Sequence, residues 1–293
     1  MNELLHFDSE KQEFSFNEDK LNNIDFRSLA LGELFHANRS FAIIKGFLSK
    51  DVAIKIKNFY TNSQNKNIFV KASPEGNSRI FYYLNSPYVY PKFVVSLLKS
   101  CMFIKNKIYQ YHDYYQYYCM IKNIDPKAFR EVVDLQVLHS WQAVYWYRNS
   151  ESHFKHIDNY GELACFLILS EKSKDYDEGG LKVYYEGSRG DIFLDDYYEY
   201  GDLVFLDQSQ VYHEVLPVKH RENQVGRLSM YVPTIPPNYM KKTLFFEGFP
   251  LSPKSTTGNI PFLDRVCAIY TSLLKREQIH HSRVKFCHFD TVL

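Results

Sequence analysis

Three side chains in the second half of the sequence have the types and spacing of a metal site. His156 and Asp158 are two residues apart, and His213 follows after several short apolar segments. Two histidines and one carboxylate can hold a non-haem iron on one face and leave the opposite face open for other ligands. The pattern therefore predicts a mononuclear iron site made by His156, Asp158 and His213.

A basic residue and a hydroxyl follow the second histidine on a single apolar segment. Arg227 and Ser229 are two residues apart, so in a strand they point to the same side of the sheet. A guanidinium pairs with a carboxylate through a planar two-donor fork, which the point charge of a lysine does not offer. The pair predicts a carboxylate clamp, with an ordinary surface ion pair as the alternative role for Arg227.

The elements that must position these residues are short strands. Alternating apolar segments are separated by turns that contain glycine, such as 179–180, 190–191 and 201–202. The segments lie at 135–138, 142–147, 163–169, 181–185, 203–206 and 227–232. Several short strands with this punctuation favour a double-sheet jelly roll.

Helices are predicted on both sides of this strand-rich region. A strand at 40–48 precedes Ser49, which is a good N-cap for a helix that continues to about Tyr60. Apolar residues recur at helical spacing over 91–109 and again over 260–275. We expect these helices to pack against the sheets.

The chain of 293 residues shows no internal repeat and no clean linker, so 1–293 is predicted as one domain. The predicted fold class is α+β, mainly β. Its core is a double-stranded β-helix, that is, a jelly roll or cupin-like barrel, at 133–235. Residues 1–132 supply supporting helices and strands, and 236–293 form a C-terminal extension.

Composition limits the classes of partner. With 35 basic and 34 acidic side chains the net charge is +1, which supplies no overall field to attract nucleic acid or an anionic bilayer. No apolar run is long enough to span a membrane, and the N-terminus lacks a signal-peptide pattern. Five cysteines without a CxxC pair suit a reducing compartment. We therefore expect a cytoplasmic protein without nucleic-acid or membrane partners; its oligomeric state is not predicted.

The order of the motifs over 135–233 resembles the iron(II)/2-oxoglutarate-dependent dioxygenase superfamily. The strand that begins at Gly179-Gly180 after a polar loop, and the run 201–207 that leads to His213, are both similar to segments of that family. The resemblance implies that the iron ligands are His156, Asp158 and His213. It also implies that the far carboxylate of 2-oxoglutarate is held by Arg227 and Ser229.

The same resemblance implies an activity and a set of cofactors. The expected reaction is hydroxylation of an unactivated C–H bond with Fe(II), 2-oxoglutarate and dioxygen, with release of succinate and CO2 and with ascorbate as a supporting reductant. The family often places a hydrogen-bonding side chain near 2-oxoglutarate on the strand that leads into the HxD pair. Tyr147 is our candidate for that role, and Tyr145 on the same face is its alternative.

Substrate and ligand alternatives remain open at this point. The HxDN segment and the polar loop look similar to the phytanoyl-type branch and to bacterial sugar (Kdo) hydroxylases, which implies a small polar metabolite or a saccharide as substrate. A peptide or protein hydroxylase, or a non-catalytic metal-binding jelly roll, is the alternative. His139, His153 and His220 are rival ligands with less suitable positions. We expect 191–200 to be a solvated connection, or else a loop that closes over substrate.

Overall fold

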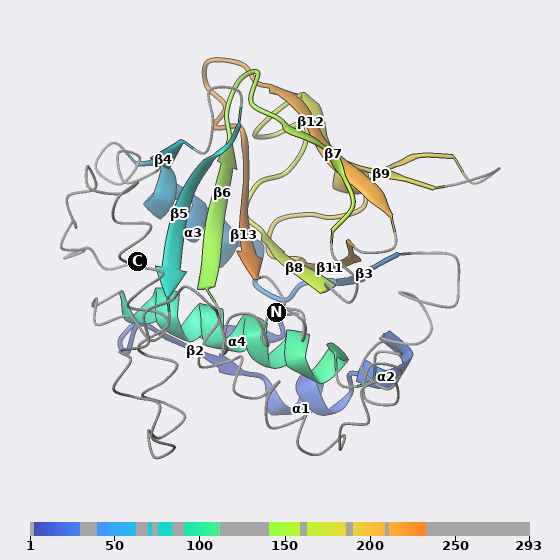
Figure 1. The fold of residues 1–293 in the computed structure, drawn as a ribbon. Helices are drawn as coiled ribbons and strands as arrows, with labels where there is room; N and C mark the ends of the chain where they lie inside the picture. The colour runs from blue at the N-terminus through green and yellow to red at the C-terminus, as the bar shows by residue number, and fades with distance from the viewer. Residues whose placement is uncertain are drawn as a thin grey trace, which may run out of the picture.

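Antiparallel sheets make up most of the described chain (Figure 1). The computed structural model describes residues 3–29, 40–62, 70–71, 76–83, 91–109, 111, 141–158, 163–185, 190–208 and 211–232. A hairpin of β1 (Leu5–Asp8) and β2 (Glu13–Phe16) lies outside the two larger sheets. The mainly β class predicted from the sequence is therefore confirmed.

Two larger sheets carry the functional residues. The seven-stranded sheet has the order β3 (Phe41–Ile44), β11 (Leu203–Asp207), β8 (Leu163–Ile168), β13 (Arg227–Val232), β6 (Trp141–Tyr147), β5 (Ser78–Tyr83) and β4 (Val70–Lys71). The four-stranded sheet has the order β10 (Ile192–Phe193), β9 (Glu178–Tyr184), β12 (Tyr212–Lys219) and β7 (His153–His156). From β6 to β13 the chain passes repeatedly from one sheet to the other.

Strands β8, β11 and β13 of the seven-stranded sheet are buried on both faces. In β8, Leu163, Cys165 and Leu167 belong to a core shared with the helices. Their neighbours Ala164 and Phe166 belong to a second core that lies between the two sheets. Because successive residues of a strand point to opposite faces, a continuously apolar strand is what a sheet between two cores requires.

Helices cover the outer face of this sheet. Helix α3 (Lys50–Thr61) begins after Ser49, whose hydroxyl accepts a hydrogen bond from the Val52 amide at 3.4 Å. Helix α4 (Lys92–Tyr109) contacts β8 and β13 and runs beneath the strands in Figure 1. Both helices were predicted from the sequence and are confirmed. Two short helices, α1 (Glu18–Asn22) and α2 (Phe26–Ser28), follow the hairpin.

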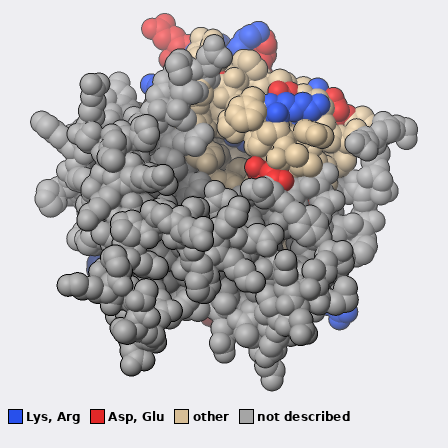
Figure 2. All heavy atoms as spheres, in the orientation of Figure 1, with Lys and Arg blue, Asp and Glu red and all other residues tan. Residues whose placement is uncertain are grey.

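Other sequence expectations fall outside the described residues. The predicted strand at 135–138 and the predicted helix at 260–275 are among them, as is the whole of 236–293. Among the helices of the described part, none is long and apolar enough to cross a membrane. On the face seen in Figure 2, the basic and acidic side chains of the described part lie intermixed and do not gather by sign.

Candidate metal centre

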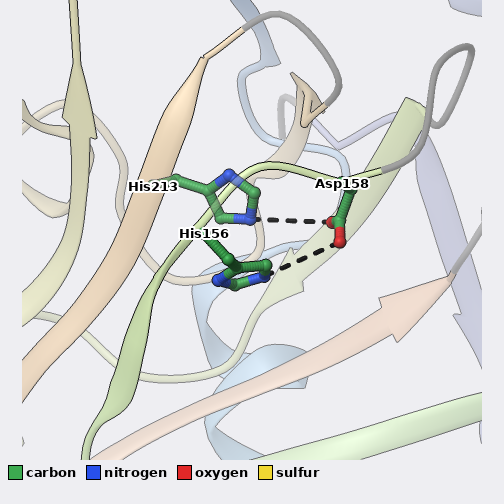
Figure 3. Close-up of side chains that lie close together, drawn as sticks. All are labelled: His156, Asp158 and His213. Carbon is green, nitrogen blue, oxygen red and sulfur yellow. Dashed lines mark ion pairs between the residues drawn. The ribbon is translucent and has the colours of Figure 1, made fainter.

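Strand pairing brings the two histidines and the aspartate together. His156 is the last residue of β7, Asp158 follows it by two positions, and His213 lies in β12. His156 and His213 are direct partners in the antiparallel β7–β12 pair. One potential ligand atom from each of the three residues lies within 4.8 Å of the others. The register of two neighbouring strands therefore assembles the group that the sequence singled out (Figure 3).

Each oxygen of Asp158 faces one imidazole ring. Nε2 of His156 is 3.7 Å from Oδ1, and Nε2 of His213 is 3.6 Å from Oδ2. Both separations, drawn as dashed lines in Figure 3, exceed the usual length of a hydrogen bond. The three groups thus converge on a common region without bonding to one another directly.

The tautomer of each histidine follows from its hydrogen bond to the main chain. Nδ1 of His156 lies 2.8 Å from the carbonyl oxygen of Phe154, and Nδ1 of His213 lies 3.1 Å from that of Val211. A carbonyl oxygen only accepts, so each Nδ1 carries a proton and each Nε2 is the ring nitrogen left to face a metal. Ligating histidines are oriented in this way at metal sites. The donor set therefore fits a divalent metal ion.

The protonation states agree with this assignment. Burial lowers the pKa of His213 from 6.5 to about 4, so the ring is neutral near pH 7. Burial also raises the pKa of Asp158 above its usual value, an effect that His156 partly opposes. A partly buried carboxylate without a cation is costly, and a bound cation offsets that cost.

Gln208 is a site residue that the sequence did not reveal. Its side-chain nitrogen lies 3.1 Å from Nε2 of His213, and its side-chain oxygen accepts a hydrogen bond from the Tyr231 hydroxyl at 3.1 Å. Its main-chain carbonyl accepts from the amide of Asp158 at 3.0 Å. Gln208 therefore connects the aspartate to the nitrogen of His213 that a metal would use. No motif marks this glutamine; only its place just after the strand before His213 hints at proximity.

Arg227 forms a buried ion pair with Asp195. Its Nε donates to Oδ2 of Asp195 at 2.8 Å, and its Nη2 lies 3.4 Å from Oδ1 and donates to the Tyr198 hydroxyl at 3.0 Å. Burial opposes the charge of Arg227, but the neighbouring Asp195 raises its pKa well above the usual value. The surface ion pair considered from the sequence is thus replaced by an internal one that keeps the guanidinium charged.

The burial of Asp195 contradicts the expectation that 191–200 is a solvated connection. It lies in a single turn of 3-10 helix, η4 (Leu194–Asp196), and its side chain is fully buried. It accepts hydrogen bonds from the hydroxyls of Tyr176 and Tyr198 and from the Leu181 amide at 3.0 Å. The expectation of a solvated connection is wrong here, because tyrosine hydroxyls and Arg227 supply the partners that a buried carboxylate needs.

Ser229 and the two tyrosine candidates lie beside Arg227. On the neighbouring strand β6, Tyr147 is the register partner of Arg227 and Tyr145 is the partner of Ser229. The Tyr145 ring stacks on Tyr231 with a centroid distance of 5.2 Å. The Ser229 hydroxyl is buried and finds no hydrogen-bond partner in the described part of the chain. A ligand oxygen would satisfy it, since a buried hydroxyl without a partner is costly.

A cavity of about 270 Å³ extends from the metal ligands to the arginine. Its lining includes His156, Asp158, His213, Tyr145, Tyr147 and Arg227. Ser229 is not among the lining residues. The volume, the metal donors at one part of the lining and the guanidinium donors of Arg227 at another suit a small dicarboxylate.

Of the rival histidines, the two in the described part of the chain, His153 and His220, do not join the group of three. His153 lines the cavity and packs edge-on against His156 with ring centroids 4.7 Å apart, but it is not part of the clustered ligand set. His220 is partly exposed, and its Nδ1 lies 2.9 Å from the carbonyl oxygen of Arg221. His139 lies outside the described residues.

No protein-family model matches the sequence, and no curated protein matches it. A prolyl-4-hydroxylase from Pseudomonas putida is 14% identical over 71% of this chain and 98% of that chain, with a TM-score of 0.47. A prolyl hydroxylase from Trichoplax adhaerens, solved with a hypoxia inducible factor oxygen degradation domain peptide fragment, is 12% identical over 75% and 93% of the two chains (TM-score 0.45). A protein from Caulobacter crescentus described as of the 2OG-Fe(II) oxygenase family is 14% identical over 73% and 83% (TM-score 0.44). By their descriptions, these neighbours are two prolyl hydroxylases and a member of the 2OG-Fe(II) oxygenase family.

Proposed function

We propose that this chain is an Fe(II)- and 2-oxoglutarate-dependent oxygenase that hydroxylates an unactivated C–H bond. The observation that carries the proposal is the β7–β12 pairing. It brings His156 and His213 side by side, so that their Nε2 atoms lie next to the two oxygens of Asp158 in a cavity that also contains Arg227. Two imidazoles and one carboxylate leave coordination positions open for a cosubstrate and dioxygen.

In this proposal the three ligands would hold the iron, and β13 would hold the distal end of 2-oxoglutarate. Arg227 would bind the distal carboxylate, and the orphaned hydroxyl of Ser229 would donate to it. Tyr147 would add a further donor from β6, with Tyr145 as the alternative. Because His213 is already neutral, it would bind metal near pH 7 without first losing a proton.

The chemistry supplied by the bound iron, 2-oxoglutarate and dioxygen is C–H hydroxylation with release of succinate and CO2. The chain itself would fix the ligands, orient the cosubstrate between the metal ligands and Arg227, and shield the reacting groups from water with the buried walls of the cavity. No feature of the described site supports a role for ascorbate.

We further propose that β6 to β13 form a double-stranded β-helix within a single catalytic domain. In support, β6, β8, β11 and β13 lie in the seven-stranded sheet, whereas β7, β9, β10 and β12 lie in the other sheet. Every pairing among these strands is antiparallel.

For the substrate, we propose a small polar metabolite or a saccharide. The cavity is small, and Gln208, Asn77 and three tyrosines give its lining hydrogen-bonding groups. A peptide is the second candidate, which is favoured by the large apolar side chains of Phe154 (71% exposed) and Ile157 (43% exposed) next to the metal ligands.

The test is an anaerobic titration of the protein with Fe(II) and then 2-oxoglutarate, in which bidentate chelation produces a weak visible charge-transfer band. We expect the band in the wild type and expect Arg227→Ala to need far more 2-oxoglutarate to produce it. Arg148→Ala is the matched control, because Arg148 is half exposed and pairs with Glu151 outside the cavity lining. An iron-loaded wild type without the band would overturn the proposal and favour a non-catalytic metal-binding protein.

A further inference from the structure

The hydrogen-bonding edges of Arg227 are unequally occupied. Asp195 takes the edge formed by Nε and Nη2, and Tyr198 accepts a further hydrogen bond from Nη2. Among the described residues, Nη1 has no hydrogen-bond partner. Arg227 lines the cavity. The N–H groups of Nη1, and any N–H of Nη2 that is not already donating, are therefore the donors available to a ligand.

Both oxygens of Asp195 accept hydrogen bonds from donors other than Arg227. Burial and the charge of Asp195 raise the pKa of Tyr176, so its hydroxyl keeps its proton and donates to the carboxylate. The Leu181 amide of β9 donates as well. Gly180 leaves room for the carboxylate, since a Cβ at that position would lie 2.3 Å from Oδ2 of Asp195. The carboxylate therefore has little freedom to follow a moving guanidinium.

We infer that Asp195 is a positioning residue for cosubstrate recognition: it fixes the guanidinium of Arg227 so that a distal carboxylate is bound end-on through the free Nη1 edge. This inference rests on the proposed function. Because Asp195 cancels the charge of Arg227, the pair offers a carboxylate little net charge, and recognition comes from the geometry of the donors.

The Asp195→Asn variant distinguishes two roles for Asp195: fixing the orientation of Arg227 and neutralising its charge. Asp195→Asn removes a negative charge, which by charge alone would tighten the binding of any dicarboxylate. It also turns one acceptor atom into a donor that faces the existing donors, so the guanidinium would lose its fixed orientation. If positioning dominates, 2-oxoglutarate binds more weakly to the variant despite the favourable change in charge.

The first measurement needs neither iron nor cosubstrate. In the metal-free protein we expect the Nε–H group of Arg227 to give a slowly exchanging NMR resonance, identified by its absence in Arg227→Lys. Asp195→Asn should abolish its protection from exchange. Asp175→Asn is the matched control, because Asp175 is likewise a buried carboxylate, held by Lys57 and Tyr200. An unaltered resonance in Asp195→Asn would overturn the inference.

The second measurement uses the anaerobic iron-loaded protein with 2-oxoglutarate or with 2-oxovalerate, which has a methyl group in place of the distal carboxylate. We expect Asp195→Asn to raise the dissociation constant for 2-oxoglutarate about ten-fold and to leave that for 2-oxovalerate unchanged. Unchanged or tighter binding of 2-oxoglutarate would overturn the inference.

Tyr198→Phe decides the matter if Asp195→Asn does not fold, because it removes a single hydroxyl between Arg227 and Asp195. We expect about a three-fold rise for 2-oxoglutarate alone, and no change in either dissociation constant would count against positioning. A wild type that binds no 2-oxoglutarate but shows the protected resonance, lost in Asp195→Asn, would refute the proposed function and leave the fixed guanidinium standing.

Discussion

Acid should destabilise the metal-free protein through His213. The ring is 3% exposed and neutral, and its burial lowers its pKa from 6.5 to about 4. In the unfolded chain the same histidine takes up a proton near pH 6.5. Between these two pH values the unfolded state binds more protons than the folded state, so the stability contributed by His213 is complete above pH 6.5 and is lost as the pH falls towards 4.

The size of the effect follows from the two pKa values. They differ by about 2.5, and each pKa unit corresponds to about 1.4 kcal/mol, so acid should remove about 3 kcal/mol of the free energy of unfolding. Asp158 acts in the opposite direction, because its raised pKa lets the folded protein hold a proton that the unfolded chain releases. Comparing two proteins that both carry Asp158 removes the part of this contribution that does not depend on residue 213.

The assay is urea unfolding in the presence of a chelator, at several pH values between about 7.5 and 4, for the wild type and for His213→Gln. We expect the stability advantage of the wild type over the variant to shrink by about 3 kcal/mol across that interval. The reasoning is refuted if the difference between the two proteins stays constant within about 0.5 kcal/mol.

Three further outcomes test other parts of the site. Asp158→Ala should lose substrate-linked succinate formation and bind Fe(II) at least about 100-fold more weakly, whereas His220→Ala should match the wild type in both assays. Gly180→Ala should lower the free energy of unfolding by about 3 kcal/mol or more, because its φ is +102° and the new methyl would strike a buried carboxylate. Gly190→Ala, with φ of +71° and open space around it, should cost only about 1 kcal/mol by thermal or urea melts. Ser229→Ala should change stability by less than about 1 kcal/mol and raise the KM for 2-oxoglutarate about three-fold; an unchanged KM would remove Ser229 from the clamp.

The local signals in the sequence were sufficient for the elements with strong periodicity. The serine cap and helical spacing located α3 and α4, and continuous apolar runs located β8, β11 and β13. Strand β12 was not predicted, since Glu214, Pro217 and Lys219 interrupt its apolar residues. In the folded protein, buried and more exposed residues alternate along most of β12, because one face of the strand packs against the core.

The sequence indicated the candidate metal ligands and the candidate carboxylate-binding residues. It did not indicate the residues that orient them through hydrogen bonds. His156, Asp158 and His213 form a motif whose residue types and spacing are meaningful in the sequence alone. Asp195 and Gln208 have no such signal, because their roles arise from contacts between elements. Asp195 contacts Arg227 only once η4 lies next to β13 in the folded chain. In the sequence, Asp195 stands in a segment rich in Asp and Tyr, a composition typical of a surface loop.

Because β7 lies at the edge of its sheet, a bound metal would also affect the local stability of that edge. This four-residue strand is the last of its sheet, and in the described part of the chain it pairs only with β12, through a register that shifts between His213 and Val215. Short edge strands open at low local free energy. A cation bound by His156 and Asp158 from one strand and by His213 from the next would fasten this edge, so loading would slow amide hydrogen exchange in β7 far more than in the doubly paired β8. The bound cation would then stabilise the edge strand that carries two of its own ligand residues or their immediate extension.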